Sequence, residues 1–150
     1  MNVKKFVLAW VVAFVVTFLL AVLWHLFLLA DFYEVQSQAL AREEPNMAVI
    51  IVGYLILGFL MALVYPIGYK GGSPVKEGFR FGALIGLIWI LPWSVIIHGL
   101  WNYPLAGVIV DSAWRVVEEG IAGIGIALVY GRQPEALKVD ESELDEATLG

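Results

Sequence analysis

The chain has 150 residues, of which 61% are hydrophobic and 15% are charged, and its mean hydropathy of +0.83 is far above that of an ordinary soluble domain. The net charge of −5 does not indicate nucleic-acid binding, because the acidic surplus lies close to the C-terminus. The absence of cysteine excludes disulfides, thiolate metal sites and cysteine nucleophiles. We therefore expect an integral membrane protein whose main partner is the lipid bilayer.

The first apolar run, residues 6–30, follows Lys4-Lys5 and is long enough for a helix that crosses a hydrocarbon core of about 30 Å. A cleaved signal peptide is the alternative, but its apolar region would be only about 7–15 residues long and would end in a small-x-small site. The end of this run does not match such a site, so we expect a retained helix. Residues 31–47 then form a polar connection, with Phe32-Tyr33 placed to sit at the membrane interface.

Three further apolar segments predict transmembrane helices over residues 48–68, 79–101 and 104–131. Glycine and proline punctuation separates the first two of these segments. Pro104 suits the start of the last helix, because its missing N–H costs little in the first turn. The predicted fold is all-α, a bundle of four transmembrane helices within a domain of residues 1–131.

The distribution of Lys and Arg predicts the orientation of the bundle. Basic residues cluster before the first span, between the second and third, and after the fourth: Lys4, Lys5, Lys70, Lys76, Arg80, Arg132 and Lys138. The positive-inside rule therefore predicts that both termini are cytoplasmic, and an even number of spans agrees with this.

Residues 132–150 form an acidic tail that contains Glu135, Asp140, Glu141, Glu143, Asp145 and Glu146. Its low content of large apolar side chains predicts a mobile cytoplasmic segment. A docking site for a basic partner and a merely solvated chain end are both open, and we favour the solvated end.

Two features predict how the helices pack. Gly78, Gly82 and Gly86 recur at every fourth position and lie on one side of the third helix, and Gly120 and Gly123 give the fourth helix a similar small surface. Such faces let backbones approach closely in lipid, either within one chain or between copies. Pro92 removes a backbone hydrogen bond inside the third span, so we expect a kink there.

The fourth span carries charged side chains at membrane depth. Asp111, Arg115 and Glu118 lie within about 60° of one another when each residue advances ~100°. A charge at the bilayer centre costs roughly 2.5–3.5 kcal/mol even on the lenient insertion scale, so this stripe should face the other helices. Arg115 can pair with Glu118 or Glu119 but neutralises only one carboxylate. We therefore expect at least one of Asp111, Glu118 and Glu119 to hold a proton at neutral pH.

His25 and His98 lie near the outer ends of the first and third spans, at a depth that Asp111 can share. The three side chains suggest a divalent-metal site or a path for protons. The alternative, which we favour, is that the histidines only satisfy internal hydrogen bonds, because the spacing is not that of a metal motif. The metal and any cofactor are therefore left unassigned.

Three stretches resemble an uncharacterised family of small bacterial four-helix inner-membrane proteins, classed as a domain of unknown function. They are Asp31-Phe32-Tyr33, residues 77–82 (EGFRFG), and Pro104-Leu105-Ala106 with residues 110–114 (VDSAW). The resemblance implies a four-helix fold in the inner membrane and no established activity. It does not extend to Arg115, Glu118 and Glu119.

Three functions are compatible with these patterns. We favour a non-catalytic structural or accessory subunit of a homo- or hetero-oligomeric assembly, whose partners are other membrane subunits or copies of itself. The alternative is a small proton- or cation-linked transporter or channel that uses the intramembrane carboxylates. A metal-dependent membrane enzyme is the third hypothesis, but neither GxSxG nor GxGxxG occurs, so we do not expect an enzyme.

Overall fold

The computed structural model describes residues 2–37, 42 and 44–131, and every element in this part of the chain is helical. The elements are listed in chain order: α1 (Val3–Val22), the π-helix η1 (Leu23–Leu28), α2 (Ala30–Ser37), α3 (Met47–Gly68), α4 (Pro74–Leu100) and α5 (Leu105–Tyr130). The all-α prediction is confirmed. The predicted acidic tail, residues 132–150, lies outside the described residues.

Local capping explains where the helices begin. The Asn46 side chain accepts a hydrogen bond from the backbone N–H of Val49 at the start of α3, and Ser73 accepts one from Lys76 at the start of α4. With Pro74 at its first position, α4 begins before residue 79, where the apolar run alone placed its start. Helix α2 occupies a segment expected to be a loop.

Three helical segments are long and apolar enough to cross a membrane: Val3–Leu28, which joins α1 and η1, α3 and α4. Helix α5 has 26 residues, a similar length, but its charged side chains keep it outside this group. The apolar helices agree with the prediction of a membrane protein.

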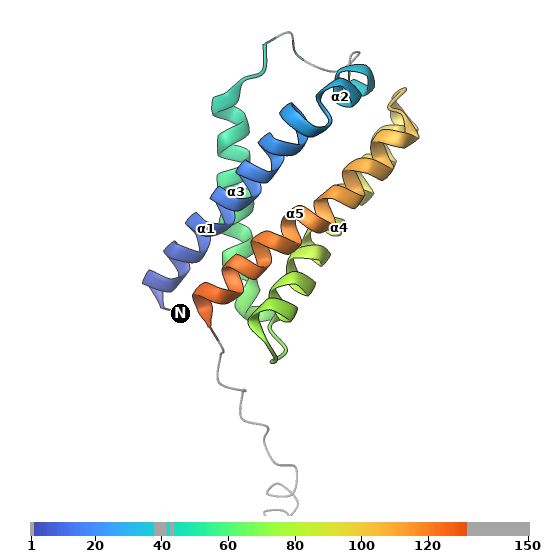
Figure 1. The fold of residues 1–150 in the computed structure, drawn as a ribbon. Helices are drawn as coiled ribbons and strands as arrows, with labels where there is room; N and C mark the ends of the chain where they lie inside the picture. The colour runs from blue at the N-terminus through green and yellow to red at the C-terminus, as the bar shows by residue number, and fades with distance from the viewer. Residues whose placement is uncertain (1, 38–41, 43, 132–150) are drawn as a thin grey trace, which may run out of the picture.

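The four long helices form an antiparallel bundle in which α1 lies between α3 and α5, and α4 packs along α5 (Figure 1). The start of α1, the α3–α4 turn and the end of α5 lie at one end, which we call the basic end. There the Lys5 ammonium donates to the backbone carbonyl of Tyr130 at 2.8 Å. The opposite end, with α2 and the α4–α5 connection, is the α2 end.

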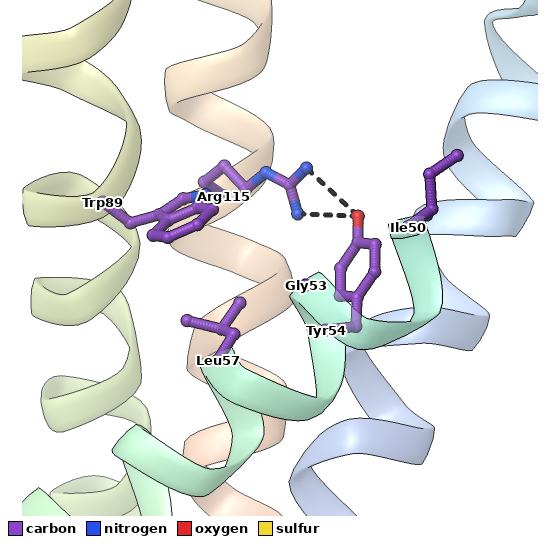
Figure 2. A pocket seen from close by; sticks show the side chains of 6 residues that line it. All are labelled: Ile50, Gly53, Tyr54, Leu57, Trp89 and Arg115. Atoms are coloured by element: carbon purple, nitrogen blue, oxygen red, sulfur yellow. Dashed lines mark hydrogen bonds between the residues drawn. The ribbon is translucent and has the colours of Figure 1, made fainter. Parts of the chain in front are cut away.

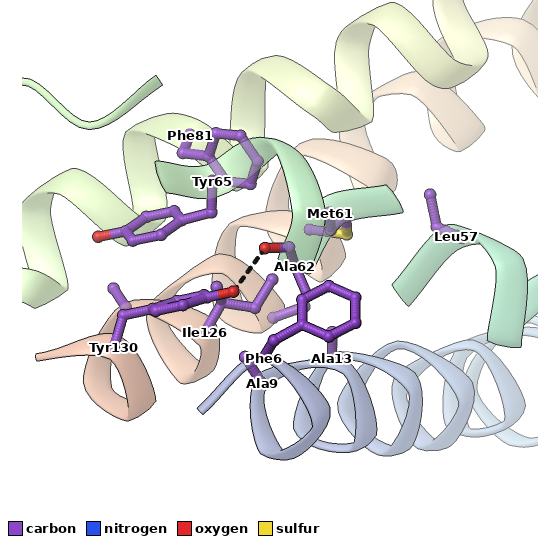
Figure 3. Close-up of a cluster of buried hydrophobic side chains, with 12 residues drawn as sticks. Phe6, Ala9, Ala13, Leu57, Met61, Ala62, Tyr65, Phe81, Ile126 and Tyr130 are labelled. Carbon is purple, nitrogen blue, oxygen red and sulfur yellow. Dashed lines mark hydrogen bonds between the residues drawn. The ribbon is translucent and has the colours of Figure 1, made fainter. Parts of the chain in front are cut away.

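The apolar core fills the half of the bundle near the basic end (Figure 3). Tyr65 stacks on Tyr130 with ring centroids 5.7 Å apart and meets Phe81 edge to face. The Tyr130 hydroxyl donates to the backbone carbonyl of Ala62 at 2.9 Å. These contacts join α3, α4 and α5, so this half of the bundle is closed.

Glycine contacts hold α4 against α5. A Cβ atom added at Gly78, Gly82 or Gly86 would come closer than 3.0 Å to the α5 backbone. On α5, Gly123 faces Gly78 and Gly82 in return, and Gly120 faces the ring of Phe79. These glycine faces therefore meet within one chain.

Candidate functional site

A cavity of about 600 Å³ opens in the half of the bundle near the α2 end. Residues from α1, η1, α2, α3, α4 and α5 line it, and most of its wall is apolar. The polar and ionisable side chains in the wall are His25, Tyr33, Tyr54, Tyr103, Asp111 and Arg115. A mostly apolar cavity with a few convergent polar groups is the usual form of a small-ligand site.

Two tyrosines hold the Asp111 carboxylate. The Tyr33 hydroxyl donates to Asp111 Oδ1 at 2.5 Å, and the Tyr103 hydroxyl donates to Oδ2 at 2.6 Å. Burial, reinforced by these hydrogen bonds, raises the pKa of both tyrosines well above the usual range, so both remain donors. The carboxylate is therefore fixed at the wall of the cavity by α2 and by the α4–α5 connection.

Aromatic contacts fix Tyr33 in turn. The Trp24 indole N–H donates to the Tyr33 hydroxyl oxygen at 3.0 Å, and the Trp24 ring stacks on Trp114 with centroids 4.1 Å apart. Trp24 belongs to the π-helix η1. Single π-turns are frequent at functional sites. Through Trp24, η1 contacts both α2 and α5.

Arg115 lies one turn deeper than Asp111 and lines the same cavity. Its guanidinium donates to Glu118 Oε1 at 2.5 Å. Through both terminal nitrogens it also donates to the Tyr54 hydroxyl, at 3.2 and 3.3 Å (Figure 2). The ion pairs of Arg115 are with Glu118 and, at 4.0 Å, with Glu119. Arg115 thus connects α5 to α3 across the floor of the cavity.

Glu118 and Glu119 are both 0% exposed. In the part of the chain that the structure describes, Glu118 Oε2 and both carboxyl oxygens of Glu119 have no hydrogen-bond donor. Two buried carboxyl groups therefore share the single guanidinium of Arg115. Both side chains thus lie inside the bundle, and the predicted proton on one of the carboxyl groups stays a prediction.

The two histidines do not share one site. His25 lines the cavity, where its Nδ1 lies 2.9 Å from the carbonyl of Ala21 and its ring centroid lies 4.4 Å from that of Tyr33. His98 is exposed and uses Nδ1 to contact the carbonyl of Tyr103 at 2.6 Å. Among the described residues, no group of three or more His, Cys, Asp and Glu side chains is placed to hold a metal ion. The metal hypothesis gains no support there.

Pro92 lies inside α4, which continues from Pro74 to Leu100, and its side chain is exposed. It does not line the cavity, whose α4 contribution is Ile90. Pro92 therefore does not belong to the cavity wall, and the predicted kink stays a prediction.

Sequence reasoning identified the charged groups but not the tyrosines that bind them. The sequence predicts an interfacial position for Tyr33, and it does not indicate the contacts of Tyr54 and Tyr103. The sequence signal for two of these tyrosines is their position, because Tyr33 follows Asp31-Phe32 and Tyr103 precedes Pro104 in the short motifs. Their contacts with Asp111 and Arg115 depend on tertiary packing, which those motifs do not specify.

The fold and site together define a helical membrane protein with a mostly apolar cavity that carries a few polar groups between its helices. The chain belongs to the family described as "Predicted membrane protein (DUF2177)", whose match covers residues 6–127. The resemblance inferred from the sequence is thereby confirmed. No curated protein and no solved structure matches the chain.

Proposed function

We propose that the protein is a small proton-linked carrier, in which intramembrane carboxylates couple the movement of a small ligand to that of protons. The supporting observation is the position of Glu118 and Glu119 between an open and a closed half of the bundle. The cavity ends at Arg115 and Tyr54, and the two buried carboxyl groups follow before the apolar core begins. Alternating access requires a ligand site that opens to one side of the membrane at a time.

Proton coupling is supported by the number of acids at this boundary. Glu118 and Glu119 share one cation, and three of their four oxygens lack a donor among the described residues. Buried ionisable groups inside a membrane protein commonly mark ion and proton pathways. Opening of the closed half would hydrate these groups and let them exchange protons with that side.

The carrier is proposed to have four spans in the inner membrane, with both termini cytoplasmic. Helix α5 has 26 residues, about 39 Å at ~1.5 Å per residue, which exceeds a hydrocarbon core of ~30 Å. Its charged groups face the bundle, which lowers the cost of spanning. The lysines of α1 and of the α3–α4 turn lie at the basic end, and the positive-inside rule assigns that end to the cytoplasm.

Proton uptake by reconstituted vesicles tests this function. Purified protein is placed in vesicles made from the total lipid extract of its host membrane, a potassium diffusion potential is imposed with valinomycin, and a trapped dye reports internal pH. We expect uptake above that of empty vesicles, and loss of this excess in the Glu118→Gln/Glu119→Gln double variant. Glu34→Gln, an exposed carboxylate of α2, serves as the control and should retain uptake. Uptake equal to that of empty vesicles by folded wild-type protein contradicts the proposal.

The accessory-subunit hypothesis is the second candidate, with other membrane subunits or copies of this chain as partners. The main glycine faces meet inside the chain, so they are not available for packing against a partner subunit. The hypothesis retains one supporting observation, because a Cβ at Gly53 or Gly99 would have no neighbour within 4 Å and both helices leave backbone open there. The mass of the protein in native lipid particles tests it, since a discrete assembly much larger than one chain is expected.

A further inference from the structure

We propose that the cavity at the α2 end binds a zwitterionic phospholipid, with the ammonium group on Asp111, the phosphate on Arg115 and an acyl chain between α3 and α4. This inference names the ligand of the carrier and therefore rests on the proposed function. It combines three features of the cavity: an anionic group, a cationic group one helical turn deeper, and a side opening with apolar walls.

The anionic group is suited to an ammonium ion. Each oxygen of Asp111 accepts one tyrosine hydroxyl. A carboxylate offers about four acceptor positions, so an ammonium ion can add its own hydrogen bonds without displacing either tyrosine. The rings of Tyr33, Tyr103 and His25 also line the cavity, and aromatic faces attract cations.

The cationic group is suited to a phosphate. Arg115 is four residues from Asp111, about 6 Å along the helix, so a two-carbon bridge between ammonium and phosphate is a suitable length. Its contacts with described residues use Nη1 for Glu118 and Tyr54 and one N–H of Nη2 for Tyr54. The Nε–H and the second N–H of Nη2 remain for an anion.

A smaller cavity of about 160 Å³ joins this site from the side, between α3 and α4. It shares Ile50, Tyr54 and Arg115 with the larger cavity and adds Gly53, Leu57 and Trp89 (Figure 2). Trp89 is 50% exposed, and a Cβ at Gly53 would meet nothing within 4 Å, so this slot opens on the lipid-facing side of the bundle. A free water-soluble zwitterion would leave the slot unfilled, whereas the acyl chain of a lipid would fill it.

The test compares two lipids that differ in the ammonium group. The detergent-purified protein is mixed with equimolar phosphatidylethanolamine and phosphatidylglycerol of identical acyl chains. Native mass spectrometry then identifies the bound lipid by its mass and gives the ratio of the two bound forms. We expect wild type to retain phosphatidylethanolamine at least tenfold over phosphatidylglycerol. Asp111→Asn, which keeps the shape and an acceptor but not the charge, should bring the ratio close to one, and Glu34→Gln should leave it unchanged. Equal retention by wild type, or an unchanged preference in Asp111→Asn, overturns the proposal.

Two further measurements distinguish a membrane lipid from a free soluble headgroup, and the ligand assignment from the proposed carrier function. Glycerophosphoethanolamine, the headgroup without chains, should not displace the lipid at equal concentration; displacement would identify a soluble ligand and overturn the lipid assignment. Gly53→Phe, which fills the slot, should lose the lipid, and unchanged retention counts against the proposal. The wild-type ratio remains decisive if a variant fails to fold. The protein could take up protons in vesicles of phosphatidylglycerol and phosphatidylethanolamine and yet retain both lipids equally. That result would support the carrier function and contradict only the assignment of this ligand.

Discussion

Asp111 connects three parts of the chain that are distant in sequence. Its two oxygens bind Tyr33 from α2 and Tyr103 from the α4–α5 connection, and Trp24 of η1 fixes Tyr33. Hydrogen bonds to a charged acceptor contribute about 1.5–3 kcal/mol, more than bonds between neutral groups. Asp111 therefore lines the cavity and also joins α2 and the α4–α5 connection to α5 at the α2 end.

Removing this acceptor should destabilise the protein. Asp111→Ala leaves two partly buried tyrosine hydroxyls without their acceptor, and we expect a loss of about 1–3 kcal/mol in the free energy of unfolding. Asp111→Asn should lose less, because the amide oxygen still accepts one hydroxyl and the amide nitrogen can donate to the other tyrosine. Unfolding midpoints in detergent, followed by tryptophan fluorescence, measure both; equal stability of Asp111→Ala and wild type would contradict the assignment.

Among the helices, α4 and α5 are the most closely packed pair. Gly82 is the tightest point, because a Cβ there would meet the backbone of Glu119 and Gly120. Backbone cannot move aside as a flexible side chain can, so a methyl group must separate the helices. Such a separation would also displace Glu119 from its place beneath the cavity.

A matched pair of glycine variants tests this contact. Gly82→Ala should cost about 1–3 kcal/mol of stability, the usual range for overpacking a close contact. Gly99→Ala lies in the same helix, but its added Cβ meets nothing within 4 Å, and alanine favours a helix by about 1 kcal/mol, so stability should hold or rise. Thermal unfolding of the two purified variants decides; equal behaviour of the pair would mean that the α4–α5 contact is looser than described.

Apolar runs predicted the long helices because each run must hide its backbone from lipid. The glycine spacing at Gly78, Gly82 and Gly86 predicted a close-packing face, but a periodic pattern does not specify its partner helix. Capping by Ser73 and Pro74 and the π-turn of η1 depend on local geometry that hydropathy does not report. The cavity was also missed, because it arises where α3 diverges from α4, and its tyrosines come from three separate segments.

The whole bundle has one closed half with an apolar core and one open half with a cavity whose polar side chains include Asp111 and Arg115. Glu118, Glu119 and Arg115 lie at the boundary between these halves. The function of a carrier requires the closed half to open, whereas the function of a static subunit does not. The difference between the two proposed functions therefore reduces to whether the core near the basic end opens.

Two-sided accessibility of single cysteines measures this opening most directly, and the natural chain has no cysteine to remove. Val22→Cys places a thiol in the cavity wall, and Ala62→Cys places one in the core, where Ala62 is 0% exposed. A membrane-impermeant maleimide is added to right-side-out or to inverted vesicles. For a carrier, we expect Val22→Cys to react from the α2 end and Ala62→Cys to react, more slowly, from the basic end. A folded Ala62→Cys protein that remains unlabelled from the basic end, while Val22→Cys is labelled from the other, would contradict the carrier function.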